Sequence, residues 1–185
     1  ITVRDWSSDV CSSDLVDGAG RVLVGLADDT NIHDNEIGAT GQSEGVRIAG
    51  RAASSCATEM TDSQRTLLRE NLIRHTSGAG VRLYRGSGDP GGPAASDVSC
   101  NDIAQNGTGV LSDWVGAVGG AQNRLALNDV RLNTVGVRNF AAEDLPATPM
   151  WWNSPSGPGG AGPGTGDSVF GAVAFGPWLS TSART

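Results

Sequence analysis

Two groups of charged side chains in this 185-residue chain have types and spacing that suit chemistry. The densest acidic group, Asp28, Asp29, Asp34 and Glu36, surrounds His33. Hydrolysis of a glycosidic bond needs two carboxyl groups that flank the bond. The acidic group is therefore a candidate for such a site, although a solvated acidic turn is the simpler interpretation.

The second group is basic and consists of Arg47, Arg82 and Arg138, each of which directly follows a valine. If these arginines stack on neighbouring strands, they form a positive stripe that suits an anionic glycan. The simpler interpretation is mutual neutralisation on a solvated face, because several carboxylates sit at comparable places (Glu36, Asp102 and Asp129). The possible ligand face therefore comprises Arg47, Arg82, Arg138, Asp28, Asp29 and Glu36.

A phrase that occurs four times must position these side chains. Each copy has an asparagine, an aliphatic residue three places before it and a β-branched residue two places after it, and the asparagines are Asn35, Asn71, Asn101 and Asn128. A Gly-Val pair begins 8 to 10 residues after each asparagine. Self-similarity at a period of about 20 to 50 residues indicates a solenoid, a propeller or an array.

Apolar and polar residues alternate within the phrase, as in Val81-Arg82-Leu83, which is strand spacing. We therefore expect a parallel β-solenoid whose aliphatic residues stack in interior columns. We expect each asparagine to form a left-handed corner and the four side chains to hydrogen bond as a ladder. Each glycine before the valine would permit a positive φ and a close backbone approach.

The repeat resembles that of the right-handed parallel β-helix proteins of the pectate-lyase-like superfamily, over residues 20–180. The C-terminal part, with Trp151-Trp152, Gly166-Asp167-Ser168-Val169 and Pro177-Trp178-Leu179, is also similar to these proteins. The resemblance implies an all-β fold with coils over residues 16–150 and a capping segment over residues 151–185. The two tryptophans cover the end of the core under this interpretation, and a sugar-stacking platform is the alternative.

The resemblance also implies what an enzyme of this fold would contain. Its hydrolases carry several carboxylate motifs on successive coils, and only the isolated Asp28-Asp29 is present here. Its lyases use calcium-bound carboxylates with a basic residue, often arginine. We therefore assign no catalytic residue, no metal ligand and no cofactor, and calcium enters only under the lyase alternative.

Residues 4–15 resemble the translation of a common sequencing adapter and are excluded from the fold. We expect residues 1–15 to be an artefactual segment and the genuine sequence to begin near Val16, part-way along a longer solenoid. A solenoid cut in this way would expose its apolar columns at the N-terminal end and self-associate.

The net charge of −7 argues against nucleic acid as a partner, and no apolar run is long enough to span a membrane. Outside the adapter-like segment, the cysteines are Cys56 and Cys100. A disulfide between them would close a loop of about 44 residues and suit an extracellular or cell-surface location, but two unpaired thiols remain an alternative.

Three functional hypotheses follow from these observations. The first is a secreted or surface module that binds polysaccharide or is structural. The second is a polysaccharide lyase or glycoside hydrolase with part of its site in missing N-terminal coils. The third is a fragment of an adhesin or fibre.

Overall fold

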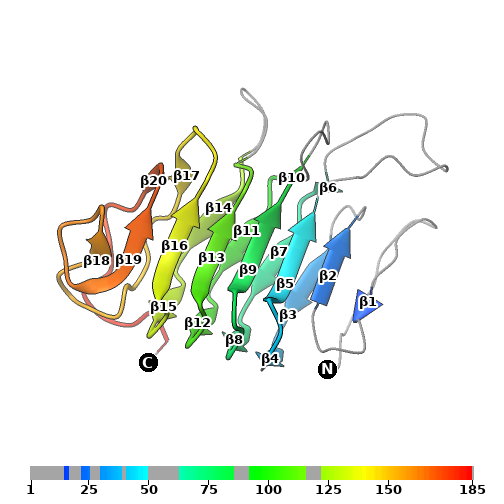
Figure 1. Ribbon diagram of the computed structural model, residues 1–185, viewed down its shortest axis with the longest axis horizontal. Helices are drawn as coiled ribbons and strands as arrows, with labels where there is room; N and C mark the ends of the chain where they lie inside the picture. Colours follow the sequence, from blue (N-terminus) through cyan, green and yellow to red (C-terminus); the bar gives the residue numbers. More distant parts are fainter. Residues whose placement is uncertain are drawn as a thin grey trace.

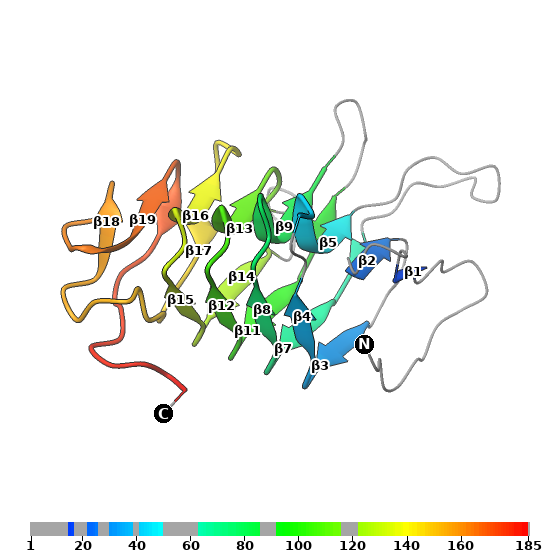
Figure 2. The same ribbon diagram turned by 60° about the horizontal axis from the view of Figure 1, so that its bottom comes forward.

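The computed structural model describes residues 15–16, 22–25, 30–38, 41–49, 63–85, 92–115 and 122–184, and these residues form strands, turns and bends without a helix. The strands stack into the coils of a parallel β-helix (Figures 1 and 2). In Figure 1 the chain rises along the front sheet, crosses behind it and returns below, so the coil is right-handed. The fold class predicted from the repeat is therefore confirmed.

Three sheets form the faces of the β-helix. The long sheet has the order β1 (Leu15–Val16), β2 (Val22–Gly25), β5 (Glu44–Ala49), β9 (Ala79–Tyr84), β13 (Thr108–Ser112), β16 (Val135–Asn139), β19 (Gly166–Phe170) and β18 (Pro158–Gly160). The second sheet has the order β14 (Arg124–Ala126), β11 (Asp97–Ser99), β7 (Leu67–Arg69) and β3 (Asn31–His33). The third sheet has the order β15 (Asp129–Arg131), β12 (Asp102–Ala104), β8 (Leu72–Arg74) and β4 (Glu36–Gly38).

Two short pairs complete the coils: β10 (Pro93–Ala94) with β6 (Ser63–Gln64), and β17 (Leu145–Pro146) with β20 (Val173–Ala174). Every pair of strands is parallel except β1 with β2. The long connectors follow β5, β9 and β13, which lie side by side in register. The C-terminal ends of these three strands therefore lie next to one another on the same side of the long sheet.

The core consists of the predicted aliphatic columns. Val46, Val81, Val110, Val137 and Val169 are in register along the long sheet, and all five are fully buried. Matching columns run through the second sheet (Ile32, Leu68, Val98, Leu125) and the third (Ile37, Ile73, Ile103, Val130). The register follows from the pattern because a shift by one residue would turn every aliphatic side chain towards solvent.

The predicted asparagines lie above one another between the second and third sheets. The Nδ2 atoms of Asn35, Asn71 and Asn101 each donate to the Oδ1 atom of the next asparagine, at 3.0 to 3.1 Å. Each Oδ1 atom also accepts the backbone N–H of the asparagine before it. The left-handed residue is the one before each asparagine, which corrects the expectation that the asparagine itself makes the corner: Asp34, Glu70, Cys100 and Leu127, with φ of 55° to 59°.

A second polar column lies between the third sheet and the long sheet, and the sequence reasoning missed it. Asn106 Nδ2 donates to Asn133 Oδ1 at 3.1 Å, and Thr76 lies at the equivalent place on the coil before. Beside this column the Gly-Val glycines are needed for close approach and not for a positive φ. A Cβ atom on Gly109 would lie 2.6 Å from the carbonyl oxygen of Gly136.

The C-terminal segment forms the last coil. Trp152 is fully buried in the same cluster as the aliphatic columns, and Trp178 packs against that cluster and donates to the Pro155 carbonyl oxygen at 3.2 Å. At the other end, Ile32 and Ile37 are only 3% and 0% exposed. The expected exposure of the apolar columns at this end, and the self-association that would follow from it, stay predictions. Residues 1–14 lie outside the described residues.

Candidate ligand-binding face

The outer face of the long sheet brings together the three arginines that the sequence singled out. Arg47 pairs with Arg82, Arg82 with Leu111, Leu111 with Arg138, and Arg138 with Phe170, each on the neighbouring strand. These five residues form one row across β5, β9, β13, β16 and β19, which lie side by side in Figure 1. The positive stripe is therefore interrupted by Leu111.

The N-terminal half of this row is neutralised by two carboxylates. Glu44 accepts from Arg47 Nε at 2.6 Å and from Arg82 NH1 at 2.8 Å. Asp113 accepts from Arg82 Nε at 2.8 Å. The guanidinium carbons of Arg47 and Arg82 lie 4.8 and 4.5 Å from the centre of the Tyr84 ring. This half is a compact charge network and not an open cationic surface.

The environment of Glu44 keeps its carboxyl group ionised. Burial on its own would raise the pKa of Glu44, but hydrogen bonds and charges from Arg47 and Arg82 together outweigh that effect. The pKa of Glu44 therefore lies below its ordinary value. A carboxyl group with a lowered pKa is poorly suited to donate a proton at neutral pH.

The C-terminal half of the row is different because Arg138 has no carboxylate partner among the residues that the structure describes. Its guanidinium carbon lies 5.3 Å from the centre of the Phe170 ring and 5.9 Å from that of Phe140. Phe140 and Phe170 are 66% and 43% exposed. The half-buried guanidinium of Arg138 therefore lies beside two exposed aromatic rings.

The turn after β16 holds Phe140 at this place. The buried side chain of Asn139 donates to the carbonyl oxygens of Glu143 and Ala172 and accepts the backbone N–H of Ala141. Phe140 follows directly, and its own N–H donates to the Ser112 carbonyl oxygen at 2.8 Å. The ring therefore stands on an ordered turn beside Arg138.

The other predicted ligand residues do not join this face. Glu36 lies on β4 in the third sheet and pairs with Arg74, while Asp28 and Asp29 lie outside the described residues. Asp102 pairs with Arg131 in that same sheet at 2.7 Å. Asp129 is buried, and it accepts the hydroxyl of Ser182 and the backbone N–H of Ala183.

The predicted disulfide stays a prediction. Cys100 is half-buried and carries a free thiol, and Cys56 lies outside the described residues. Within the described ranges no three or more His, Cys, Asp and Glu side chains form a group that could hold a metal ion. The same part of the chain contains no helix long and apolar enough to cross a membrane.

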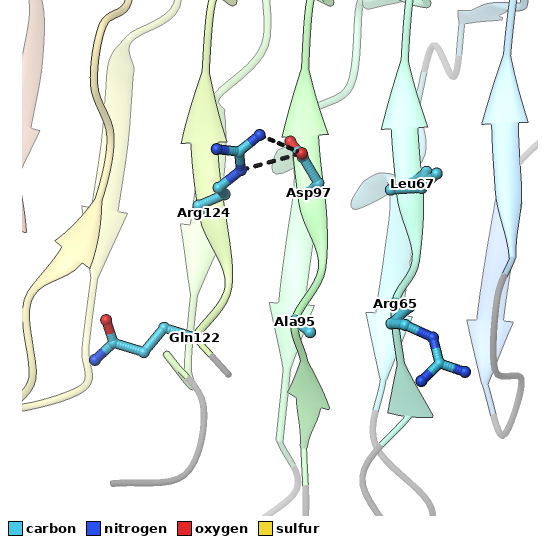
Figure 3. Close-up of a pocket in the computed structure, with 6 residues that line it drawn as sticks. All are labelled: Arg65, Leu67, Ala95, Asp97, Gln122 and Arg124. Atoms are coloured by element: carbon cyan, nitrogen blue, oxygen red, sulfur yellow. Dashed lines mark hydrogen bonds and ion pairs between the residues drawn. The ribbon is translucent and has the colours of Figure 1, made fainter. Parts of the chain in front are cut away.

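A pocket of about 350 Å³ lies on the outside of the second sheet, lined by Arg65, Leu67, Ala95, Asp97, Gln122 and Arg124. Figure 3 shows that these residues come in pairs from three successive coils, with Arg124 leaning towards Asp97. Nε and NH2 of Arg124 donate to one oxygen of Asp97 at 3.0 and 2.6 Å. This ion pair neutralises Asp97 and Arg124, and Arg65 is the other charged residue of the lining.

Sequence reasoning selected Arg138 but missed the aromatic rings beside it. Phe140 is two residues further along the chain, but its orientation depends on the turn that the Asn139 side chain stabilises. Phe170 is 32 residues away and reaches Arg138 only through the register of β16 with β19. No local signal in the sequence predicts that register, because the connector between these strands differs from those of the earlier coils.

Comparison of the chain with protein-family models, with curated proteins and with solved structures gave no significant match. The structure defines the fold class as a parallel β-helix, in which every described strand pair except β1 with β2 is parallel. These comparisons identify no family, so the resemblance to the pectate-lyase-like superfamily stays a prediction from the sequence repeat.

Proposed function

We propose that this protein is a secreted or surface-exposed β-helix that binds an anionic polysaccharide on the outer face of its long sheet. The observation that carries the proposal is Arg138, which stands between two exposed rings without a carboxylate partner among the described residues.

The chemistry of this surface matches that of an acidic sugar. A sugar ring presents an apolar C–H face that packs on an aromatic ring, and an acidic sugar adds a carboxylate or sulfate group that a guanidinium binds through two parallel hydrogen bonds. Phe140 and Phe170 supply the first contact and Arg138 supplies the second. Successive strands are about 4.8 Å apart, so the row from Arg47 to Arg138 extends over about 14 Å.

The carboxylates on this face favour binding over hydrolysis. A glycoside hydrolase needs a carboxyl group with a raised pKa to protonate the leaving oxygen. Glu44 has a lowered pKa and is bound to two arginines. Asp167 has a raised pKa, but its side chain is buried beside Asn133 between the last coils.

The test is a titration of the chain with polygalacturonate, alginate and a neutral dextran by calorimetry or by retardation in affinity gels. We expect binding to an acidic polymer, and we expect Arg138→Gln to weaken it about tenfold to a hundredfold, the loss expected for charge-assisted hydrogen bonds. Arg124→Gln is the control variant because it removes the same charge from an exposed arginine, at 61%, on another face. This control variant should bind within about twofold of the affinity of the unaltered chain, since a single exposed charge away from the binding face contributes little.

Two outcomes would contradict the proposal. One is equal affinity of the chain for acidic and neutral polymers together with an unchanged affinity of Arg138→Gln. The other is the release of new reducing ends or unsaturated sugars during the incubation, which would support the enzyme hypothesis instead.

A further inference from the structure

The second polar column ends in a carboxylate. Thr76, Asn106 and Asn133 occupy successive coils, and Asp167 takes the next place. The Oδ2 atom of Asp167 accepts the backbone N–H and the Nδ2 group of Asn133 at 2.8 and 2.9 Å. Its Oδ1 atom accepts the backbone N–H of Leu132 at 3.0 Å. Both oxygens of Asp167 therefore hold the coil before it.

An asparagine could not reproduce these contacts. Asp167 offers an acceptor at each oxygen, whereas an amide offers one oxygen and one NH2 group. If the amide oxygen of an asparagine at position 167 accepted from Asn133, its NH2 group would face the N–H of Leu132, and two donors would meet. The column therefore changes from amide to carboxylate at the coil where both positions must accept.

Asp167 also sets the place of one wall of the candidate face. Its own N–H donates to the Trp152 carbonyl oxygen at 2.8 Å, so β19 is held from two sides. Three residues later on the same short strand, Phe170 stands opposite Arg138 in the register of β16 with β19. Strand β19 is only five residues long, so a loss of its anchor would move the ring.

We infer that Asp167 is a positioning residue of the glycan-binding face, because its carboxylate registers β19 on the preceding coil and so places Phe170 beside Arg138. This inference rests on the proposed function for its binding consequence, but its structural part stands independently of any ligand.

The binding arm of the test is a double-mutant cycle between Asp167→Asn and Phe170→Ala. Each single variant should weaken the affinity for the acidic polymer about five- to tenfold, the contribution of one aromatic contact, and the double variant should be no weaker than Phe170→Ala alone. Val98→Ala, a change in the fully buried column of the second sheet, controls for a general loss of stability and should bind like the unaltered chain. Unchanged affinity of Asp167→Asn, or multiplied effects in the double variant, would overturn the inference.

The structural arm measures amide hydrogen exchange. In Asp167→Asn we expect the amides of residues 166–170 to exchange at least tenfold faster while those of β13 are unchanged, and Val98→Ala should show no such selective increase in β19. If the unaltered chain binds no polysaccharide, the proposed function fails and the exchange arm still decides the inference. Equal protection of β19 in Asp167→Asn and in the unaltered chain would refute it.

Discussion

Removal of one interior amide from the asparagine ladder should cost more than removal of the terminal one. The Asn101 side chain takes part in five hydrogen bonds: it accepts two from Asn71 and donates to Asn128, Leu68 and Ser99. Asn101→Ala would leave the N–H of Asn71 without its acceptor in a fully buried place. Each lost hydrogen bond costs about 1 kcal/mol and a buried unpaired donor costs about 1–3 kcal/mol. Because these two contributions partly count the same contacts, we expect Asn101→Ala to lower the free energy of unfolding by about 4 kcal/mol.

Asn35→Ala is the matched control within the same column. Its Nδ2 group donates to two acceptors, and no described residue donates to its Oδ1 atom, so we expect a loss of about 1–2 kcal/mol. Both losses are large against a typical total stability of about 5–15 kcal/mol. The measurement is guanidinium denaturation followed by far-ultraviolet circular dichroism. Equal losses for Asn101→Ala and Asn35→Ala would refute the reasoning, because the amides would then contribute independently of their neighbours.

Three further predictions concern pH and glycine. The pKa of Glu44 is lowered on folding, so the ionised Glu44 stabilises the fold above about pH 4.5, and this stability is lost as the pH falls through the folded-state pKa. The thermal unfolding midpoint should therefore decrease in acid for the unaltered chain and decrease less for Glu44→Gln. Burial raises the pKa of Asp167, although hydrogen bonds from Asn133, Leu132 and Asn153 oppose this effect. Stability should therefore be lost as the pH rises above 3.8 and through the folded-state pKa. A pH series of denaturation midpoints should show this loss in the unaltered chain and not in Asp167→Asn. Gly109→Ala should cost about 2–4 kcal/mol because its Cβ atom would lie 2.6 Å from a backbone oxygen, whereas Gly38→Ala, with its nearest such atom at 4.0 Å, should be nearly neutral in the same denaturation assay.

The repeat predicted the architecture because each of its features has a local physical reason. The alternation in Val81-Arg82-Leu83 allows only one face of the strand to be buried, and the side-chain period of two then determines the register with Val46 and Val110. The asparagine spacing likewise predicted a stacked polar column. The prediction that each asparagine is itself left-handed was wrong. The left-handed conformation falls on the preceding residues, such as Cys100 and Leu127, whose side chains do not favour it.

The candidate face shows where local reasoning ends. The sequence indicates that Arg47, Arg82 and Arg138 are equivalent in the repeat, and the structure gives them different surroundings. Glu44 neutralises Arg47 and Arg82 because the start of β5 places it against both guanidinium groups. The coil of Arg138 offers no such carboxylate among the described residues, and it turns sharply at Asn139.

The sequence by itself therefore determined the parallel β-helix, its aliphatic columns and its asparagine ladder, since these depend on the period of the residue pattern. The tertiary structure alone decided which charges are neutralised, that Phe140 and Phe170 meet at Arg138, and that Asp167 ends the second column. These contacts join residues on different coils across connectors of unequal length, so no spacing within one repeat specifies them.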